Sequence, residues 1–379
     1  MEEDSSNSVD LLLVEKPLRT AGGLGLVLVV CSFLFLLLLV VISYFGASVR
    51  TPPAALTGVV MMLPFLSTAF LVWTFGVWVI APDRRGPPFC LAVAVLWLGA
   101  QWGPAWPSFT SSDERIPLTV MEWNVERLWG ETDDGRTALD CVRDTLEVVK
   151  PDWISFLEVS ANELRQLSEG LPLTCVQADY LNSGSASRGG LAMCAYGDKW
   201  SLTGGGPQPF MDNDNWTYVF AEFSHGDARA NALAVHLRPY ALGIHSIRES
   251  MFDFAAGDLG PLQRLHEEGV TVAKSQGDHS EALLDRVSKF NDPTVVAGDF
   301  NSTRDMALHY RLRERLVDAF DAVGTGSGAT VRMGGWIPLR VDYIYHTQDI
   351  QSERAKVLGV HCSDHQPIVA ELFVPNGLD

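Results

Sequence analysis

The sequence predicts an α/β sandwich domain preceded by an all-α membrane region. Long apolar runs fill the first part of the chain, and most of the charged residues come after them. In the second part, short apolar strands alternate with amphipathic helical segments. Several of these strands end in a polar residue, which places the expected functional site at one edge of the sandwich.

The membrane region is predicted from three apolar runs. They extend from Ala21 to Gly46, from about Ala54 to Ile80 and from about Pro88 to Trp102. The first run is long enough to span a bilayer. A signal peptide is the alternative for this run, but its length and the two runs that follow favour three transmembrane helices within residues 21–103.

The basic residues near these runs predict the orientation of the chain. Lys16 and Arg19 precede the first run, and Arg84 and Arg85 separate the second from the third. By the positive-inside rule, residues 1–20 form a cytoplasmic tail. Three crossings then leave the rest of the chain on the extracytoplasmic side of a cell membrane, as a multi-pass protein whose first partner is the lipid bilayer.

A linker rich in Pro and Ser, residues 104–114, leads into a domain over residues 115–379. Residues 111–379 carry 23 of the 28 Lys and Arg and 40 of the 46 Asp and Glu, which accounts for a net charge of −17 out of −18. A domain this acidic should not bind nucleic acid through a broad basic face, although divalent cations can bring a polyanion to an acidic cleft. Its four cysteines permit disulfides without specifying their pairing.

The pattern of apolar residues gives an order of elements for this domain. Strands are expected at Ile116–Val125, Trp153–Leu157, Gly189–Tyr196, Thr217–Phe223, Ala230–Leu237, Pro293–Ala297 and Leu339–Tyr345, with a last segment at Val360–Leu372. Helices are expected at Leu139–Val149, after a capping box at Ser160–Glu163, at Ser280–Phe290, and from a cap at Ser302 or Thr303 to Leu316. Residues 240–278 lack a strong period and predict an insertion or lid over one end of the sheet.

The segment Gly298-Asp299-Phe300-Asn301 ends a buried strand and is the central candidate for a site. If its tip stays extended, the side chains of Asp299 and Asn301 point to one face. A carboxylate beside a neutral amide suits a site that holds a hard cation and a phosphate. Taken alone, the segment is about as compatible with a turn held by side-chain hydrogen bonds.

Six predicted strand ends carry polar residues that fit one kind of chemistry. In chain order they are Asn124, Glu158, His236, Asp299 with Asn301, Asp342, and Asp364 with His365. This ordered set over residues 115–374 resembles the endonuclease/exonuclease/phosphatase (DNase I-like) superfamily. Leu157 stands where that superfamily usually has Gln. The order of membrane region and domain also resembles membrane-anchored bacterial members linked to glycopeptide resistance.

The resemblance implies a four-layer α/β/β/α sandwich with a Mg²⁺ or Mn²⁺ cofactor. Glu158 would be the principal metal ligand, with Asn124 and Asp364 beside it. Carboxylates that hold a hard cation also suit the chemistry independently, because hydrolysis of a phosphate ester is limited by charge repulsion.

The remaining residues receive catalytic roles from the same resemblance. Asp299 and Asn301 would orient the nucleophile and the phosphate, and His236 would bind a phosphoryl oxygen. His365, held by Asp342, would activate water, since a carboxylate on the far nitrogen fixes the tautomer of a histidine base.

The sequence therefore predicts a membrane-anchored, metal-dependent phosphoesterase that acts outside the cytoplasm. The tether and the acidic domain favour a lipid-linked phosphate. The resemblance to proteins linked to glycopeptide resistance implies a polyprenyl phosphate or pyrophosphate. An extracellular nuclease is the enzymatic alternative. A catalytically silent binding module on a membrane anchor is the alternative of another class, although such proteins usually lose a metal carboxylate or the closing Asp-His pair.

Overall fold

The computed structural model describes most of the domain after residue 114. The described residues are 115–132, 135–179, 189–212, 216–240, 260–326, 328–333 and 337–376, together with Leu34, Val72, Trp73 and Ala92. The predicted tail, transmembrane helices and linker otherwise lie outside the described residues. Within the part of the chain that is described, no helix combines the length and the apolar composition needed to cross a membrane.

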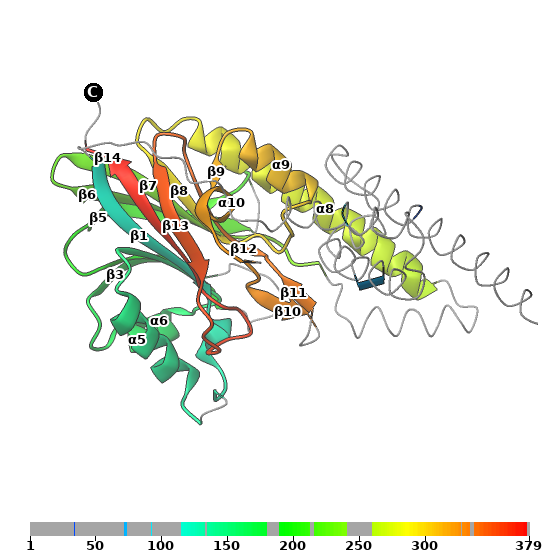
Figure 1. The fold of residues 1–379 in the computed structure, drawn as a ribbon, viewed down its shortest axis with the longest axis horizontal. Helices are drawn as coiled ribbons and strands as arrows, with labels where there is room; N and C mark the ends of the chain where they lie inside the picture. Colours follow the sequence, from blue (N-terminus) through cyan, green and yellow to red (C-terminus); the bar gives the residue numbers. More distant parts are fainter. Residues whose placement is uncertain are drawn as a thin grey trace, which may run out of the picture. The chain divides into compact units, whose positions relative to one another are not determined.

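Two six-stranded sheets form the body of the domain (Figure 1). The first has the order β13 (Gln351–Val357), β14 (Ile368–Pro375), β1 (Arg115–Asn124), β2 (Trp153–Leu157), β4 (Gly190–Tyr196) and β3 (Leu173–Asp179). The second has the order β5 (Ser201–Pro209), β6 (Thr217–His225), β7 (Ala228–His236), β8 (Thr294–Asp299), β12 (Asp342–His346) and β9 (Val317–Asp318). A two-stranded hairpin, β10 (Val331–Met333) and β11 (Ile337–Leu339), precedes β12.

Helices cover the outer faces of both sheets, which gives the predicted four layers. α5 (Ala138–Val149) and α6 (Ala161–Ser168) pack on the first sheet, and α8 (Gly260–Val287) and α9 (Ala307–Arg313) pack on the second (Figure 1). α10 (Ala319–Val323) packs beside β12 and β13. The largest apolar core lies between the sheets, where the rings of Trp153 and Phe223 stack with centroids 4.3 Å apart.

Local signals explain where the helices α5 and α6 begin and end. The Thr137 side chain accepts a hydrogen bond from the Asp140 amide at the start of α5, and Lys150 ends the helix in a left-handed conformation before Pro151. Ser160 and Glu163 form the predicted capping box of α6. The two helices therefore follow the sequence closely.

The prediction for residues 240–278 is wrong over its second half. α8 begins at Gly260 and continues to Val287, so residues 260–278 are helical rather than part of an irregular lid. The helix buries Gln276, His279 and Ser280 against the domain. Because this buried face is partly polar, it leaves no clear apolar period in the sequence.

Other differences lie in the second sheet and at the edges of the first. α9 begins after Met306, which provides no side-chain cap, so the predicted cap at Ser302 or Thr303 is wrong. The strands β3, β5 and β13 were not predicted; β5 contains three consecutive glycines and is mostly exposed. Such edge strands depend on pairing with a neighbour more than on their own composition.

Two disulfides cross-link the domain. Cys175 and Cys194 join the neighbouring strands β3 and β4, where they are register partners. Cys141 and Cys362 join α5 to the segment between β13 and β14, across 221 residues of sequence. The second disulfide holds the chain immediately before Ser363, Asp364 and His365.

Candidate active site

The pairing of the strands brings the predicted site residues to one edge of the sandwich. β1 and β2 are parallel, as are β7 and β8, so the carboxyl ends of both pairs lie at this edge. His236 at the end of β7 is the register partner of Asp299 at the end of β8. Asp342 at the start of the antiparallel strand β12 pairs with the same Asp299.

One carboxylate oxygen, Oδ2 of Asp299, lies at the centre of the candidate site. The Nδ2 atom of Asn124 lies 3.4 Å from it, Nε2 of His236 3.6 Å and Nε2 of His365 3.8 Å. These side chains come from β1, β7 and the segment before β14, and hence from both sheets. The Asp299 side chain is 2 % exposed, and its pKa is raised to about 8, first by burial and then by the charge of Asp342.

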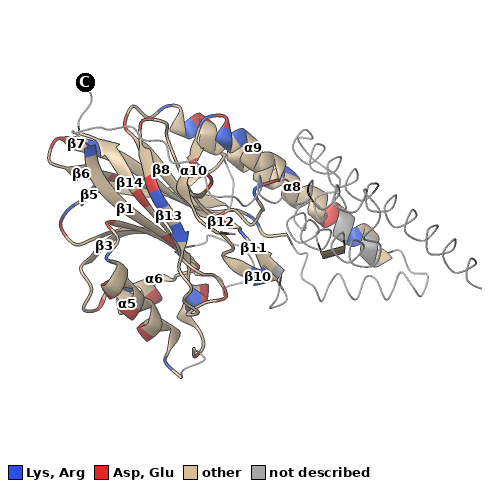
Figure 2. Cartoon of the chain, viewed as in Figure 1, with Lys and Arg blue, Asp and Glu red and all other residues tan. Residues whose placement is uncertain are grey.

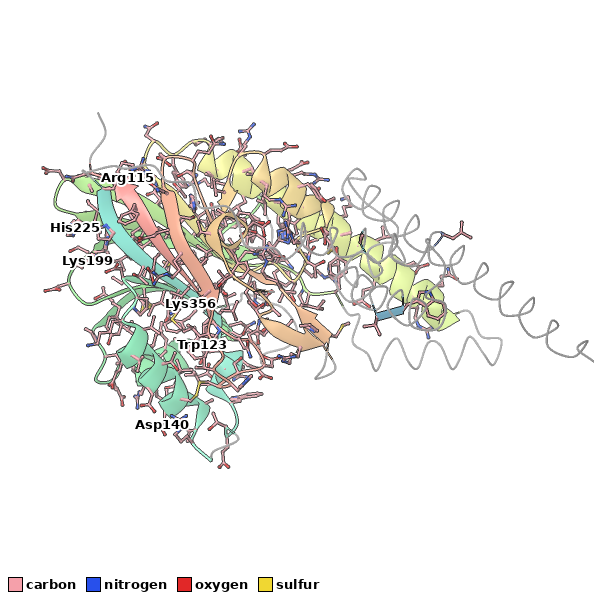
Figure 3. The ribbon with its side chains drawn as sticks, viewed as in Figure 1. Arg115, Trp123, Asp140, Lys199, His225 and Lys356 are labelled. Carbon is pink, nitrogen blue, oxygen red and sulfur yellow. A yellow bond between two sulfur atoms is a disulfide. The ribbon has the colours of Figure 1, made fainter. Side chains whose placement is uncertain are left out.

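His365 and Asp342 form the closest polar pair of the site. Nδ1 of His365 lies 2.8 Å from Oδ2 and 3.1 Å from Oδ1 of Asp342. Burial alone would lower the pKa of His365, but the charges of Asp342, Asp299 and Asp364 and the hydrogen bond with Asp342 raise it to about 10. The backbone of His365 is also fixed, because its carbonyl accepts a 3.1 Å hydrogen bond from the indole of Trp123. Figure 3 labels Trp123 among the side chains of the domain.

Glu158 is presented by an unusual backbone at the end of β2. Its φ angle is +54°, in the left-handed region that non-glycine residues rarely adopt. Gly189 packs directly on this turn: a Cβ at that position would lie 2.5 Å from the carbonyl carbon of Glu158. Oε1 of Glu158 accepts a 3.2 Å hydrogen bond from Asn124 and lies 3.9 Å from Nε2 of His236. Strained geometry of this kind clusters at functional sites.

Asn301 also has a left-handed backbone, with φ +49°. Its backbone N–H donates a 2.7 Å hydrogen bond to Oδ1 of Asp299, and its side-chain Nδ2 donates one of 2.9 Å to the carbonyl of Leu237. The buried side chain of Gln276 on α8 donates to the carbonyls of Arg238 and Phe300, at 2.8 and 3.2 Å. Gln276 therefore ties together the two segments that carry His236 and Asn301.

Asp364 lies at the exposed side of the site, beside a carboxylate that the sequence analysis missed. The Ser363 hydroxyl donates to the backbone carbonyl of Asn124 at 2.9 Å, which holds this segment against β1. Glu126 follows Asn124 by two residues, and its pKa is raised by burial and by the charges of Asp364 and Glu158. The spacing of Asn124 and Glu126 matches that of Asp299 and Asn301, so this spacing is the signal that could have identified Glu126.

These features agree with a comparison of the sequence with protein-family models. Residues 121–365 match the model of the Endonuclease/Exonuclease/phosphatase family. The chain belongs to this family. Members of the endonuclease/exonuclease/phosphatase family hydrolyse phosphoesters, so the protein is a hydrolase that acts on phosphate ester bonds.

Solved structures of the endonuclease/exonuclease/phosphatase family share the fold of this domain. A family protein from Bacteroides vulgatus aligns with a TM-score of 0.52 and 15% identity, over 68% of this chain and 99% of its own. A second from Bacteroides thetaiotaomicron gives a TM-score of 0.50 and 13% identity, over 69% and 100%. A third from Leptotrichia buccalis C-1013-b gives 0.50 and 14%, over 67% and 99%. No curated protein matches the sequence.

The donor set fits the divalent metal on which the endonuclease/exonuclease/phosphatase family typically depends. Glu126 is close enough to both Glu158 and Asp364 for their charges to raise its pKa, and oxygen donors of this kind suit a hard cation. A second group, Asp299, Asp342 and His365, has ligand atoms within 4.8 Å of one another. Within that second group His365 is hydrogen-bonded to Asp342, while its other ring nitrogen lies 3.8 Å from Asp299.

Glu122 is a further acidic residue that the sequence analysis did not single out. It lies on β1 and is fully buried, and its two carboxyl oxygens have no hydrogen-bond partner among the described residues. Burial, followed by the charges of Asp342 and Asp299, raises its pKa well above the usual range for a carboxyl group. Burial therefore favours the neutral form of Glu122.

Proposed function

We propose that the chain is a membrane-anchored, metal-dependent phosphoesterase that hydrolyses a lipid-linked phosphate or diphosphate outside the cytoplasm. The observation that carries the proposal is the convergence of Asn124, His236 and His365 on a single oxygen of Asp299. An attacking water and a phosphoryl group both need donors and acceptors within a few ångströms, and this edge of the sandwich supplies them.

His365 acts as the general base in this proposal. Nδ1 is occupied by Asp342, which leaves Nε2 to accept a proton from the attacking water. The oxygen of that water then bonds to phosphorus while the bond from phosphorus to the leaving-group oxygen breaks. Asp299 orients the water, and the side chains of His236 and Asn301 bind the phosphoryl oxygens.

Glu158, with Asn124 and Asp364, holds the cation in this proposal, and Glu126 is near enough to contribute. A bound Mg²⁺ or Mn²⁺ supplies positive charge that offsets the phosphate oxygens and the surrounding carboxylates. A cation held there would also offset the charge of Asp364, one of the three carboxylates that raise the pKa of His365.

Three features support an extracytoplasmic location for this activity. The apolar runs before residue 104 suit an anchor, and the charges around them favour a domain outside the cell. Two disulfides in the domain suit an oxidising compartment, since they are rare in the cytosol. A domain held beside a bilayer meets lipid-linked substrates at high effective concentration.

An extracellular nuclease is the second candidate function. The family includes nucleases, but the net charge of −17 after residue 110 opposes a broad contact with nucleic acid. The full-length protein should therefore be assayed with Mg²⁺ on a polyprenyl diphosphate and on DNA, with and without a chelator. Chelator-sensitive release of phosphate from the lipid, with intact DNA, is the expected result. Cleavage of DNA alone would reject the lipid substrate.

A further inference from the structure

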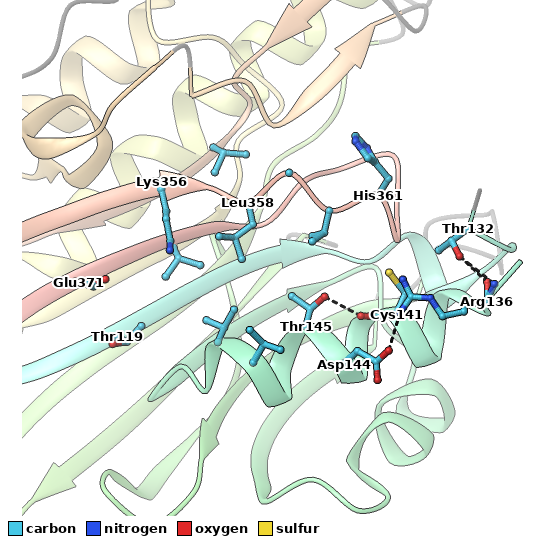
Figure 4. Close-up of a pocket in the computed structure, with 16 residues that line it drawn as sticks. Thr119, Thr132, Arg136, Cys141, Asp144, Thr145, Lys356, Leu358, His361 and Glu371 are labelled. Atoms are coloured by element: carbon cyan, nitrogen blue, oxygen red, sulfur yellow. Dashed lines mark hydrogen bonds and ion pairs between the residues drawn. The ribbon is translucent and has the colours of Figure 1, made fainter. Parts of the chain in front are cut away.

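The helix layers on the two sheets differ in how closely they pack. On the first sheet, a groove of about 920 Å³ opens between α5 and the end of β13, and none of the described residues that line it belongs to the candidate active site (Figure 4). On the second sheet, α9 packs directly on the strands, and its residues Leu308, His309 and Leu312 are buried. The closely packed layer is therefore the one that covers the strand ending in Asp299.

Ionic contacts hold the outer side of α9. Charged residues of both signs lie along α8, and α9 adds basic ones (Figure 2). An ion pair of 3.8 Å joins Arg311 of α9 to Glu281 of α8. Arg313 lies 3.3 Å from Asp321 of α10 and donates a 2.9 Å hydrogen bond to the carbonyl of Arg304. These contacts with three other segments fix the position of α9 over the sheet.

The buried side of α9 carries one polar residue, His309, which has no exposed surface. The centroid of its ring lies 5.6 Å from that of Phe300 and 4.2 Å from that of Tyr343. Phe300 stands between Asp299 and Asn301 in the chain. His309 therefore packs against the segment that carries both of these site residues.

Hydrogen bonds connect His309 to Ser302, the residue that follows Asn301. Nε2 of His309 lies 2.8 Å from Oγ and 3.1 Å from the carbonyl oxygen of Ser302, and Nδ1 lies 2.7 Å from the hydroxyl of Tyr345. A carbonyl oxygen only accepts hydrogen bonds, so we assign the ring proton to Nε2, and Nδ1 then accepts from Tyr345. Burial, followed by the charges of two nearby arginines, lowers the pKa of His309 well below its usual range, which favours this neutral ring.

A second tyrosine reaches the same carbonyl. The hydroxyl of Tyr343 lies within hydrogen-bond distance of the carbonyls of Ser302 and Arg340, at 3.1 and 3.0 Å. The side chains of Ser302, His309, Tyr343 and Tyr345 are all fully buried. A buried network whose members are all hydrogen-bonded favours a single arrangement, because a broken bond would leave a polar group without water.

Asn301 lies between this network and Asp299. Its left-handed backbone, with φ +49°, is costly for a residue with a side chain and persists where the surroundings hold it on both sides. On one side its N–H donates to Oδ1 of Asp299, and on the other Ser302 is held by His309. The side chain of Asn301 then keeps one direction, with Nδ2 2.9 Å from the carbonyl of Leu237.

We propose that His309 is a positioning residue of the hydrolase, which together with Tyr345 holds Ser302 and thereby keeps Asn301 in the orientation that binds a phosphoryl oxygen. The inference rests on the role of Asn301 in the proposed function, and it is independent of whether the substrate carries a lipid. Because its side chain has no exposed surface, His309 acts through Asn301 and does not touch the substrate.

Three variants remove different parts of the network. His309→Leu removes both ring nitrogens at similar volume. His309→Gln keeps an N–H donor for Ser302 in its side-chain amide. Tyr345→Phe removes only the hydroxyl that fixes the ring of His309, so it gives the same test if His309→Leu does not fold.

His346 provides the matched control, since it is a second buried histidine on the second sheet. It lies at the end of β12 that is away from Asp342, where its Nε2 is 2.6 Å from Oγ of Ser352 and its Nδ1 is 2.8 Å from the carbonyl of Thr347. His346→Leu therefore removes a comparable buried histidine and its bond to a serine without disturbing Asn301. Its loss of stability should be similar to that of His309→Leu.

Hydrolysis of bis(p-nitrophenyl) phosphate by the full-length proteins with Mg²⁺ tests the inference. His309→Leu should lower kcat/KM by about tenfold, the scale of a small misplacement of a catalytic group. Tyr345→Phe should lower it by about threefold, and His309→Gln should stay within about threefold of the wild type, as expected for one hydrogen bond. His346→Leu should keep the wild-type value. An equal loss in His346→Leu, or normal values in both His309→Leu and Tyr345→Phe, would overturn the inference.

A double-mutant cycle separates the inference from the proposed function. Asn301→Ala should lower kcat/KM, and adding His309→Leu or Tyr345→Phe to it should cause little further loss, because the residues act as a unit. Independent losses that multiply in the double variants would reject the inference and leave the role of Asn301 intact. A normal value in Asn301→Ala would remove Asn301 from the proposed function, and this inference with it.

Phosphate affinity gives a readout that does not need turnover. Calorimetric titration of the same proteins with inorganic phosphate at saturating Mg²⁺ should show binding weakened by about threefold or more in His309→Leu and Asn301→Ala. The affinity should recover in His309→Gln and stay unchanged in His346→Leu. This pattern would support the inference even if the diester is not hydrolysed, and only the proposed reaction would then fail. Unchanged affinity in both His309→Leu and Tyr345→Phe would overturn the inference.

Discussion

Nδ1 of His365 lies 2.8 Å from Oδ2 of Asp342, while Nε2 of the same ring lies 3.8 Å from Oδ2 of Asp299. The two ring nitrogens are therefore engaged from opposite sides, by carboxylates on neighbouring strands of one sheet. Asp342 sets the tautomer and orientation of the ring, and Asp299 lies where a water would be activated.

Asp342→Asn should lower turnover by about a hundredfold or more, because an amide favours the wrong tautomer of His365. His365→Ala should lower it to a similar extent. KM should change little in either variant. Steady-state kinetics on a phosphodiester with saturating Mg²⁺ measures the effect, with Asp349→Asn, in the exposed turn after β12, as the control. A variant with normal turnover would remove His365 from the role of base.

Glu158→Ala should lose both activity and metal affinity. The carboxylate accepts a hydrogen bond from Asn124, and its charge, like that of Asp364, raises the pKa of Glu126, so a cation bound among these groups would be favoured. Turnover should fall by at least about a hundredfold, and calorimetric titration with Mn²⁺ should show weaker binding. Glu169→Ala, at the exposed end of α6, is the control. Unchanged Mn²⁺ affinity would place the metal elsewhere.

The metal-free protein should lose stability as the pH rises. The pKa of Asp299 is raised from 3.8 to about 8, so the folded state holds a proton that the unfolded chain loses first. The pKa of His365 is raised from 6.5 to about 10, so the stability that it contributes is complete below 6.5 and is lost as the pH passes through 10. Both shifts make the folded state bind protons more tightly than the unfolded chain. The stability should therefore fall across the range from about pH 4 to about pH 10.

Urea unfolding of the chelated protein across this window measures the slope directly. Mg²⁺ should make the slope shallower, since a cation favours the charged form of Asp299 and the neutral form of His365. The stability of the variant Asp299→Asn should no longer decrease with rising pH in the acidic part of this range. Stability that increases from about pH 5 to about pH 9 in the presence of a chelator would contradict these shifts.

The two disulfides should differ in their effect on the site. Replacing Cys141 and Cys362 with Ser should cost about 2–5 kcal/mol in stability. It should also raise the Mg²⁺ concentration needed for half-maximal activity, because the disulfide holds the chain before Asp364. Replacing Cys175 and Cys194 with Ser removes a link between β3 and β4, away from this segment. It should cost stability with little change in the metal requirement. Equal effects on metal would refute the positional role of Cys362.

Gln276→Leu should reduce turnover more than it reduces substrate binding. Its side chain bridges the carbonyls of Arg238 and Phe300, so its loss should loosen the segments that carry His236 and Asn301. Turnover should fall by about tenfold, the scale of a small misplacement of catalytic groups. Gln263→Leu, on the exposed part of the same helix, is the matched control. A pure loss of stability with normal turnover would make Gln276 a structural residue only.

The sequence predicted the strand ends of the site well, because each follows a short apolar run. The register of the paired strands then brings these ends to one edge of the sandwich. The structure brings Asn124, His236, Asp299, Asp342 and His365 together at one edge, while their roles stay predictions. The sheet-on-sheet architecture and its outer helices also agree with the sequence.

What the sequence could not reveal depends on environment rather than on pattern. Glu122 has the sequence context of an ordinary strand residue, and only its complete burial in the fold raises its pKa. Gln276 and the first part of α8 carry no apolar period, because the helix uses polar contacts with loop carbonyls. β13 has an exposed charged face and forms through its pairing with β14. The membrane region lies outside the described residues and stays a prediction.

The pairing of β1 with β14 has a consequence for synthesis of the protein. The strand β1 pairs with β14 from Arg115 and Pro375 to Glu122 and Ile368, so this sheet cannot be completed until β14 has left the ribosome. His365 emerges just before that strand. Nascent or prematurely terminated chains that lack β14 should therefore be inert, and a cell would acquire the hydrolase in a single step once this strand is synthesised.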